Sequence, residues 1–184
     1  MTTYREQLTP PTGLNGRWHR LSLGIFLFIV LAHWAEHITQ AIQIWALDEP
    51  RPKARGLLGE PFPWLVREEW LHYAYALVML AGFVVLRKGF VGRAHAFWVA
   101  ALVIQVWHHF EHLLLLIQAI TNNNLDGEPV PTSILQLFYP RVELHLFYNT
   151  VVFIPMVIAM ILHLRPSRPE LERMTCGCVP AART

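Results

Sequence analysis

Two short stretches of the sequence place histidine and glutamate inside apolar surroundings, where ionisable side chains are costly. Residues 33–37 read HWAEH and residues 108–112 read HHFEH. Positions i, i+3 and i+4 share one face of a helix, so each stretch predicts three side chains that project together. They are His33, Glu36 and His37 in the first stretch and His108, Glu111 and His112 in the second. Because neutral imidazole is the commonest metal ligand in proteins, both stretches indicate metal binding.

A second pattern, LHxxY, occurs at residues 71–75 and 144–148 and adds one histidine and one tyrosine to each half of the chain. Three histidines and a carboxylate per half would suit one transition-metal ion each, so we predict a dinuclear non-haem centre of iron or copper. The predicted metal ligands are His33, His37, His72, His108, His112, His145, Glu36, Glu111 and Glu69, the last through an ExxH pairing with His72. The predicted catalytic groups are Glu36 and Glu111, which would bridge the ions or transfer protons, and Tyr75 and Tyr148, which would hydrogen-bond a ligand or take part in redox chemistry.

Other polar residues of the apolar stretches are given smaller roles. His109 lies off the shared face and is not expected to be a ligand. The residues expected to be bystanders near helix ends are His19, His95 and His163. Cys176-Gly-Cys178 would bind a soft ion such as Cu(I), although a single CxC pair in a tail is not specific. Gln43 and Gln118 are left open between hydrogen bonds that join helices and metal ligation.

The composition places these side chains in a membrane. Of 184 residues, 54% are hydrophobic and 15% are charged, which is typical of a small integral membrane protein. Four apolar segments are each near the ~20 residues that a helix needs to cross hydrocarbon. They are Leu21–Leu47, Val66–Leu86, Ala94–Ile120 and Val142–Leu164. The predicted fold is therefore all-α, with four transmembrane helices surrounded by lipid, and the net charge of +2 indicates no nucleic-acid partner.

The halves of the chain show the same motifs in the same order: HxxEH, then GEPxP, then LHxxY. This order predicts a tandem repeat of two helices plus two helices, related by a pseudo-twofold axis along the membrane normal. The predicted division is a tail over residues 1–20, a first repeat over 21–92, a second over 93–164 and a tail over 165–184. The six histidines and two glutamates would meet around this axis.

The distribution of Lys and Arg predicts the orientation. The tails and the short middle loop carry ten of these residues, and the two long loops carry five. The positive-inside rule then puts both termini in the cytoplasm of a bacterial inner membrane and the metal site toward the extracytoplasmic side. The first apolar segment is too long for the core of a cleavable signal peptide.

The stretches HWAEHITQAIQIW, FPWLVREEWLHYAYALVML, WHHFEHLLLL and PTSILQLFYPRVELHLFYNTVVFIPMVIAM resemble a family of small, histidine-rich bacterial membrane proteins, a likeness that supplies no activity. A looser likeness is to membrane fatty-acid desaturases and alkane hydroxylases, which bind two irons through HxxxH and HxxHH clusters. His33 and His37 fit HxxxH, HHFEH reads as HHxxH in reverse order, and a third cluster is missing. The likeness implies a di-iron centre with oxygen chemistry, although those enzymes hold their irons on the cytosolic side.

Three functions are compatible with this sequence. The first is an O2-activating oxidoreductase acting on a small or lipophilic substrate, with electrons from a separate donor because the chain has no flavin or iron–sulfur motif. The second is a b-type cytochrome with haem held by histidines of neighbouring helices. The third is a non-catalytic protein that binds or transports copper, zinc or iron. Four spans are few for alternating access, so transport would require a homo-oligomer.

Overall fold

The chain folds into a bundle of long helices, as the apolar segments predict. The computed structural model describes residues 13–65 and 68–178, and within these ranges it contains helices and no strand. The long helices are α1 (His19–Trp45), α3 (Glu69–Leu86), α4 (Gly92–Thr121) and α5 (Arg141–Leu164). All four are long and apolar enough to cross a membrane. The prediction of an all-α membrane protein with four transmembrane helices is confirmed.

The ends of the helices follow from local backbone chemistry. Asn122, directly after α4, adopts the left-handed conformation (φ 51°) that commonly terminates a helix. Pro140 precedes α5 in extended conformation, where its missing N–H costs nothing. Two short helices lie outside the predicted spans, α2 (Gly56–Gly59) and α6 (Arg168–Arg173). The first belongs to the long connection after α1, and the second belongs to the C-terminal tail.

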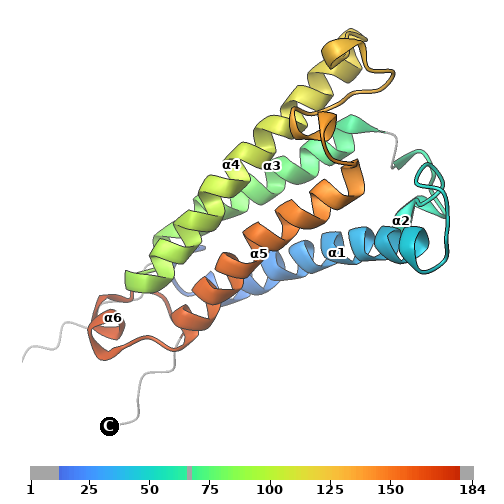
Figure 1. Ribbon diagram of the computed structural model, residues 1–184. Coiled ribbons are helices and arrows are strands. Elements are labelled where there is room, and N and C mark those ends of the chain that lie inside the picture. The colour runs from blue at the N-terminus through green and yellow to red at the C-terminus, as the bar shows by residue number, and fades with distance from the viewer. Residues whose placement is uncertain (1–12, 66–67, 179–184) are drawn as a thin grey trace, which may run out of the picture.

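The four long helices form a ring rather than two separate pairs. α4 packs along both α3 and α5, while α1 contacts α3 and α5 over a shorter length. Figure 1 shows the cause, because α1 diverges from the other three helices toward the end that carries α2. The helices that the predicted repeat makes equivalent, α1 with α4 and α3 with α5, therefore lie diagonally across the ring. The pseudo-twofold repeat itself stays a prediction.

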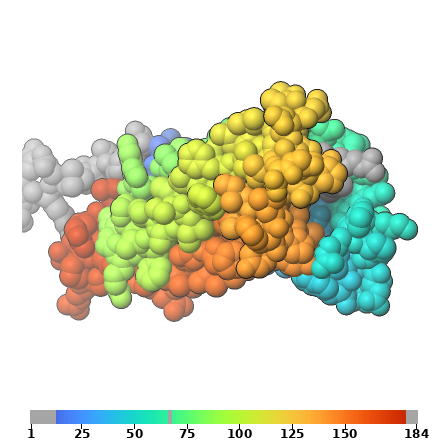
Figure 2. Space-filling model, turned by 45° about the horizontal axis from the view of Figure 1, so that its top comes forward, coloured from blue at the N-terminus to red at the C-terminus, as the bar shows by residue number. Residues whose placement is uncertain are grey.

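The two ends of the bundle differ in chemistry. One end carries the long connections, of which residues 46–65 and 122–140 are described, and the other carries α6 (Figure 2). An apolar core fills the half near α6, where Phe83, Trp98 and Met156 are fully buried. The outer faces of the helices expose large apolar side chains, such as Phe28 at 72% and Val103 at 64% exposure. Such faces suit contact with lipid, and the polar residues of the bundle gather in its other half.

Candidate metal centre

Three buried histidines from two helices lie close to one another in the bundle interior. His108 and His112 lie one turn apart on α4, and His145 faces them from the first turns of α5. One ligand nitrogen from each ring lies within 4.8 Å of those of the other two. The Nε2 atoms of His108 and His112 are 3.2 Å apart. The i, i+4 spacing and the close packing of α4 on α5 therefore bring together three ligands predicted from the sequence.

The hydrogen bonds of this group leave nitrogens free for a ligand. The Nδ1–H of His145 donates to the carbonyl oxygen of Arg141 at 2.7 Å, which leaves Nε2 as the unprotonated atom. This Nε2 is buried and has no hydrogen-bond partner within the described residues, and the same holds for Nδ1 of His108 and His112. A buried polar atom without a partner costs about 1–3 kcal/mol, so each of these nitrogens would be stabilised by a ligand.

A glutamate and a small cavity complete this side of the cluster. Glu111 is 5% exposed, and its Oε1 accepts a hydrogen bond from the Ser133 hydroxyl at 3.2 Å. Its Oε2 lies 3.8 Å from Nδ1 of His108. A cavity of about 10 Å³ lies between Glu111 and the three histidines. This volume is near the size of one water molecule or ion. The carboxylate thus lies beside His108 and faces the space at the histidines.

The other three predicted histidine ligands form a looser set on α1 and α3. The Nε2 atoms of His33 and His37 are 3.1 Å apart. Nδ1–H of His37 donates to Oε1 of Gln40 at 2.8 Å, and Nδ1–H of His72 donates to the carbonyl oxygen of Glu68 at 3.1 Å. Because Nδ1 carries the proton in both rings, Nε2 is the nitrogen that keeps a free lone pair. Because α1 diverges here, a cavity of about 200 Å³ opens beside these rings.

The two sets of histidines meet across the helix ring. The ring centroids of His37 and His145 are 5.0 Å apart, and those of His72 and His112 are 6.3 Å apart with nearly parallel planes. The six histidines therefore form one continuous cluster at the α1–α5 and α3–α4 interfaces. Their spatial convergence, expected from the sequence, is present in the fold.

The two predicted tyrosines pack against histidine rings in matching ways. Tyr75 stacks on His33 with centroids 3.9 Å apart, and Tyr148 lies against His108 at 4.4 Å. The hydroxyl of Tyr75 donates to the carbonyl oxygen of Ile29 at 3.0 Å. The hydroxyl of Tyr148 instead accepts a hydrogen bond from the Trp107 indole N–H at 2.6 Å, which leaves the phenolic proton of Tyr148 available to another acceptor.

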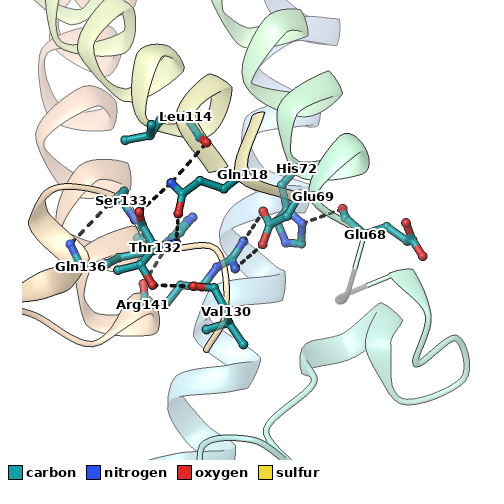
Figure 3. Close-up of polar contacts among 11 residues, drawn as sticks. Glu68, Glu69, His72, Leu114, Gln118, Val130, Thr132, Ser133, Gln136 and Arg141 are labelled. Carbon is teal, nitrogen blue, oxygen red and sulfur yellow. Dashed lines mark hydrogen bonds and ion pairs between the residues drawn. The ribbon is translucent and has the colours of Figure 1, made fainter. Parts of the chain in front are cut away.

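The structure gives two predicted glutamate ligands other partners. Oε2 of Glu36 accepts the backbone N–H of Leu58 at 2.9 Å, so this carboxylate holds α2 against α1. Both oxygens of Glu69 accept hydrogen bonds from the Arg141 guanidinium, at 2.6 and 2.8 Å (Figure 3). Glu36 still lines the cavity beside His33. Glu69 acts on Arg141, whose carbonyl oxygen holds His145, so its contact with the cluster is indirect.

The two repeated glutamines bind the long connections. Oε1 of Gln43 accepts the backbone N–H of Gly56 at 2.8 Å. Oε1 of Gln118 accepts the backbone N–H of Leu125 at 2.9 Å. It also accepts the backbone N–H of Thr132 at 3.1 Å (Figure 3). Gln43 thus joins α1 to the first residue of α2, which is one of the two roles that the sequence left open, and Gln118 ties α4 to the loop that follows it. Each loop is thereby fixed over its half of the cluster.

A wider cavity of about 480 Å³ leads to the cluster from the end with the long connections. His37, His72 and His145 line its inner side. Arg51, Arg55 and Arg141 also line it; Arg51 pairs with Glu143, and Arg141 pairs with Glu69. One imidazole-lined space thus connects both histidine sets with the surroundings of the bundle.

Two of the expected bystanders do not behave as such. His19 and His163 are completely or almost completely buried and group with Cys176 and Cys178 at the other end of the bundle. The expectation that they are bystanders is wrong, because the tail after α6 folds back onto both helices. His95 is exposed, and His109 packs against Tyr73 with ring centroids 5.2 Å apart, outside the histidine group of α4 and α5.

Comparisons with protein families, with curated proteins and with solved structures found no match to this chain. The resemblances drawn from the sequence therefore stay predictions.

Proposed function

We propose that this membrane protein holds two transition-metal ions in its histidine cluster and is an O2-activating oxidoreductase. The observation that carries the proposal is the buried group of His108, His112 and His145, in which one ligand nitrogen from each ring lies within 4.8 Å of the other two. Each ring also has a buried nitrogen without a hydrogen-bond partner among the described residues, and such atoms are rare in a protein interior unless a ligand binds them. The second set, on α1 and α3, has the same pairing of Nε2 atoms and would hold the second ion.

The donor set favours chemistry at the ions over a closed structural site. Three imidazoles per ion leave coordination positions open for O2 or a substrate, and imidazole suits both iron and copper. Glu111 would accept or return a proton beside His108, and Tyr148 would supply its phenolic proton. Tyr75 would hold the His33 ring by stacking. Electrons would come from a separate donor protein or small reductant.

The cavities favour a small, lipophilic substrate. The cavity beside His33 and His37 is also lined by Leu58, Leu65 and Leu71. It lies where α1 diverges from its neighbours, so an apolar molecule from the bilayer would reach the histidines sideways. With the orientation proposed from the Lys and Arg distribution, this region lies in the extracytoplasmic half of a bacterial inner membrane.

A non-catalytic metal-handling role is the second candidate. The cavity of about 480 Å³, which connects the loop end with His37, His72 and His145, would also admit an ion for capture or transfer. Haem is less suited, because an axial pair needs a porphyrin plane between the two imidazoles. Here His33 and His108 already stack on tyrosine rings, and the remaining rings contact one another.

Metal analysis of the protein purified in detergent from its native host tests the proposal. We expect about two iron or copper ions per chain in the cluster, and O2 consumption when a reductant is supplied. His112→Ala would lower the metal content by about one ion per chain and would abolish O2 consumption, whereas His109→Ala, on the same helix but outside the group, would preserve both. Bound ions without O2 consumption would favour metal handling. Wild-type iron and copper content in His112→Ala would overturn the ligand assignment.

A further inference from the structure

A second cluster of ligand atoms lies at the opposite end of the bundle. It takes His19 from the first turn of α1, His163 from the last turn of α5, and Cys176 and Cys178 from the tail after α6. One ligand atom from each lies within 4.8 Å of the other three. Nδ1 of His19 is 3.3 Å from Sγ of Cys178, and Nε2 of His163 is 3.3 Å from Sγ of Cys176.

The two imidazoles are held in orientations that suit a metal. Nε2–H of His19 donates to the carbonyl oxygen of Leu86 at 3.2 Å, so Nδ1 carries the lone pair that faces the cysteines. Phe90 packs against both rings, with centroids 5.3 Å from His19 and 4.7 Å from His163. His19 and His163 are 0% and 1% exposed, and both cysteines are free thiols. Three of the four residues are buried and Cys176 is half-buried, so the ligand atoms lie largely out of contact with solvent.

The backbone around the cluster is shaped to fit it. A Cβ added at Gly89 would overlap the imidazole ring of His19. The turn between α3 and α4 can approach this ring closely because Gly89 has no side chain. Glu170 fixes the tail, since its carboxylate accepts hydrogen bonds from the backbone N–H of Arg93 at 3.0 Å and of Ser167 at 2.8 Å. These contacts bring α6 onto the start of α4 and return the cysteines to the bundle.

We propose that His19, His163, Cys176 and Cys178 form a structural zinc site that fastens the C-terminal tail to the first and last transmembrane helices. Two imidazoles and two thiolates are a frequent donor set of closed, tetrahedral zinc sites. Zn–N and Zn–S bonds of about 2.0 and 2.3 Å put tetrahedral ligand atoms about 3.3–3.8 Å apart. The two nitrogen–sulfur pairs at 3.3 Å are already close to this range, and the other pairs, all within 4.8 Å, need to contract by at most about 1.5 Å.

Charge and enclosure support zinc over a catalytic ion. Two thiolates neutralise Zn²⁺, and two neutral imidazoles complete the shell, so the buried site carries no net charge. Four protein ligands leave no open position for a substrate, in contrast to the three-histidine sets at the other end. The site is independent of the proposed oxidoreductase function, and its test separates the two.

Zinc analysis of matched variants is the first test. We expect the wild-type protein to hold about one zinc ion per chain and the double variant Cys176→Ser, Cys178→Ser to lose it. The zinc would remain in His112→Ala, which removes a ligand of the other centre, and in His95→Ala, an exposed histidine near this end. Zinc retained by the cysteine variant would overturn the proposal, and so would copper at this site in place of zinc.

Two measurements do not depend on the folding of the cysteine variant. In the wild-type protein, both thiols would resist a thiol reagent until a strong zinc chelator is added, and then two would react. Gly89→Ala would weaken zinc retention at a fixed chelator concentration by about 10–100-fold, the usual effect of displacing a ligand's support. Gly24→Ala, where a Cβ meets nothing within 4 Å, would match the wild type. Thiols that react at once, or equal zinc retention in both glycine variants, would contradict the site.

Discussion

Replacing His145 with alanine gives the most direct test of the histidine cluster. His145 is 3% exposed, and its ring centroid lies 5.6 Å from that of His108 and 5.3 Å from that of His112. Alanine removes one of three imidazoles from the tighter set. The nearest substitute, His37 at 5.0 Å, donates to Gln40 and faces His33, so it would have to break both contacts to replace the lost ligand.

The magnitude follows from the role of the lost atom. Removing a partner that merely orients a ligand costs about 10–100-fold in metal affinity. Removing the ligand itself should cost at least about 100-fold, or about 2.7 kcal/mol of binding free energy. Because the ion would keep two imidazoles, binding should weaken rather than vanish at high metal concentration. The expected result is a dissociation constant raised by two orders of magnitude or more.

The assay is competition between the protein in detergent and a chelator of known affinity, with the bound iron or copper counted after removal of free ions. The matched control is His109→Ala, because His109 is a histidine of α4 that packs on Tyr73 rather than on the cluster. We expect its dissociation constant to stay within about threefold of the wild type. Helix content by circular dichroism must be equal in both variants. A His145→Ala protein that binds as tightly as His109→Ala would refute the assignment of His145.

Three further predictions concern the contacts that support the two sites. Glu69→Gln removes one charge of the ion pair between the buried Glu69 and Arg141, whose side chain is 35% exposed. The free energy of unfolding in detergent should fall by about 1–3 kcal/mol. An unchanged melting temperature would contradict this expectation. Gln118→Ala leaves backbone groups of Leu125 and Thr132 without their partner. Hydrogen exchange should therefore become faster in the second long connection and stay the same in α4. Exchange in the connection that equals the wild type would count against this role of Gln118. Hydrogen bonds from the Ser167 backbone N–H and hydroxyl lower the pKa of Glu170 to about 2, so its stabilising effect on α6 is present above pH ~4.5 and is lost as the pH falls toward 2. Glu170→Gln should remove this pH dependence from the hydrogen exchange of residues 168–173, and a variant that still loosens with acid like the wild type would show that another group is responsible.

The fold was predictable because the bilayer imposes a length and a composition on each span. The apolar segments matched α1, α3, α4 and α5 within a few residues at their ends, and Val66 lies outside the described residues. The helical period likewise predicted that His108 and His112 face the same way. These inferences need nothing beyond neighbours in the sequence.

Partners of single side chains were harder to predict. Glu69 shares a face with His72, as the ExxH spacing indicated, yet both of its oxygens bind Arg141 from another helix. Glu36 holds the start of α2, a helix that the composition did not reveal. In both cases the competing partner lies far along the chain, so the local pattern contained no sign of it.

The sequence by itself determined that four helices span the membrane and that histidines and glutamates line their inner faces, because helical periodicity and hydrocarbon thickness act on local stretches of chain. The tertiary structure decided which of these residues meet. The divergence of α1 opens a cavity of about 200 Å³ beside His33, whereas the close packing of α4 on α5 leaves only about 10 Å³ beside Glu111. The return of the tail brings His19 to Cys178, 159 residues away. Such contacts depend on how helices cross and where a loop docks, and periodicity along one helix carries no information about either.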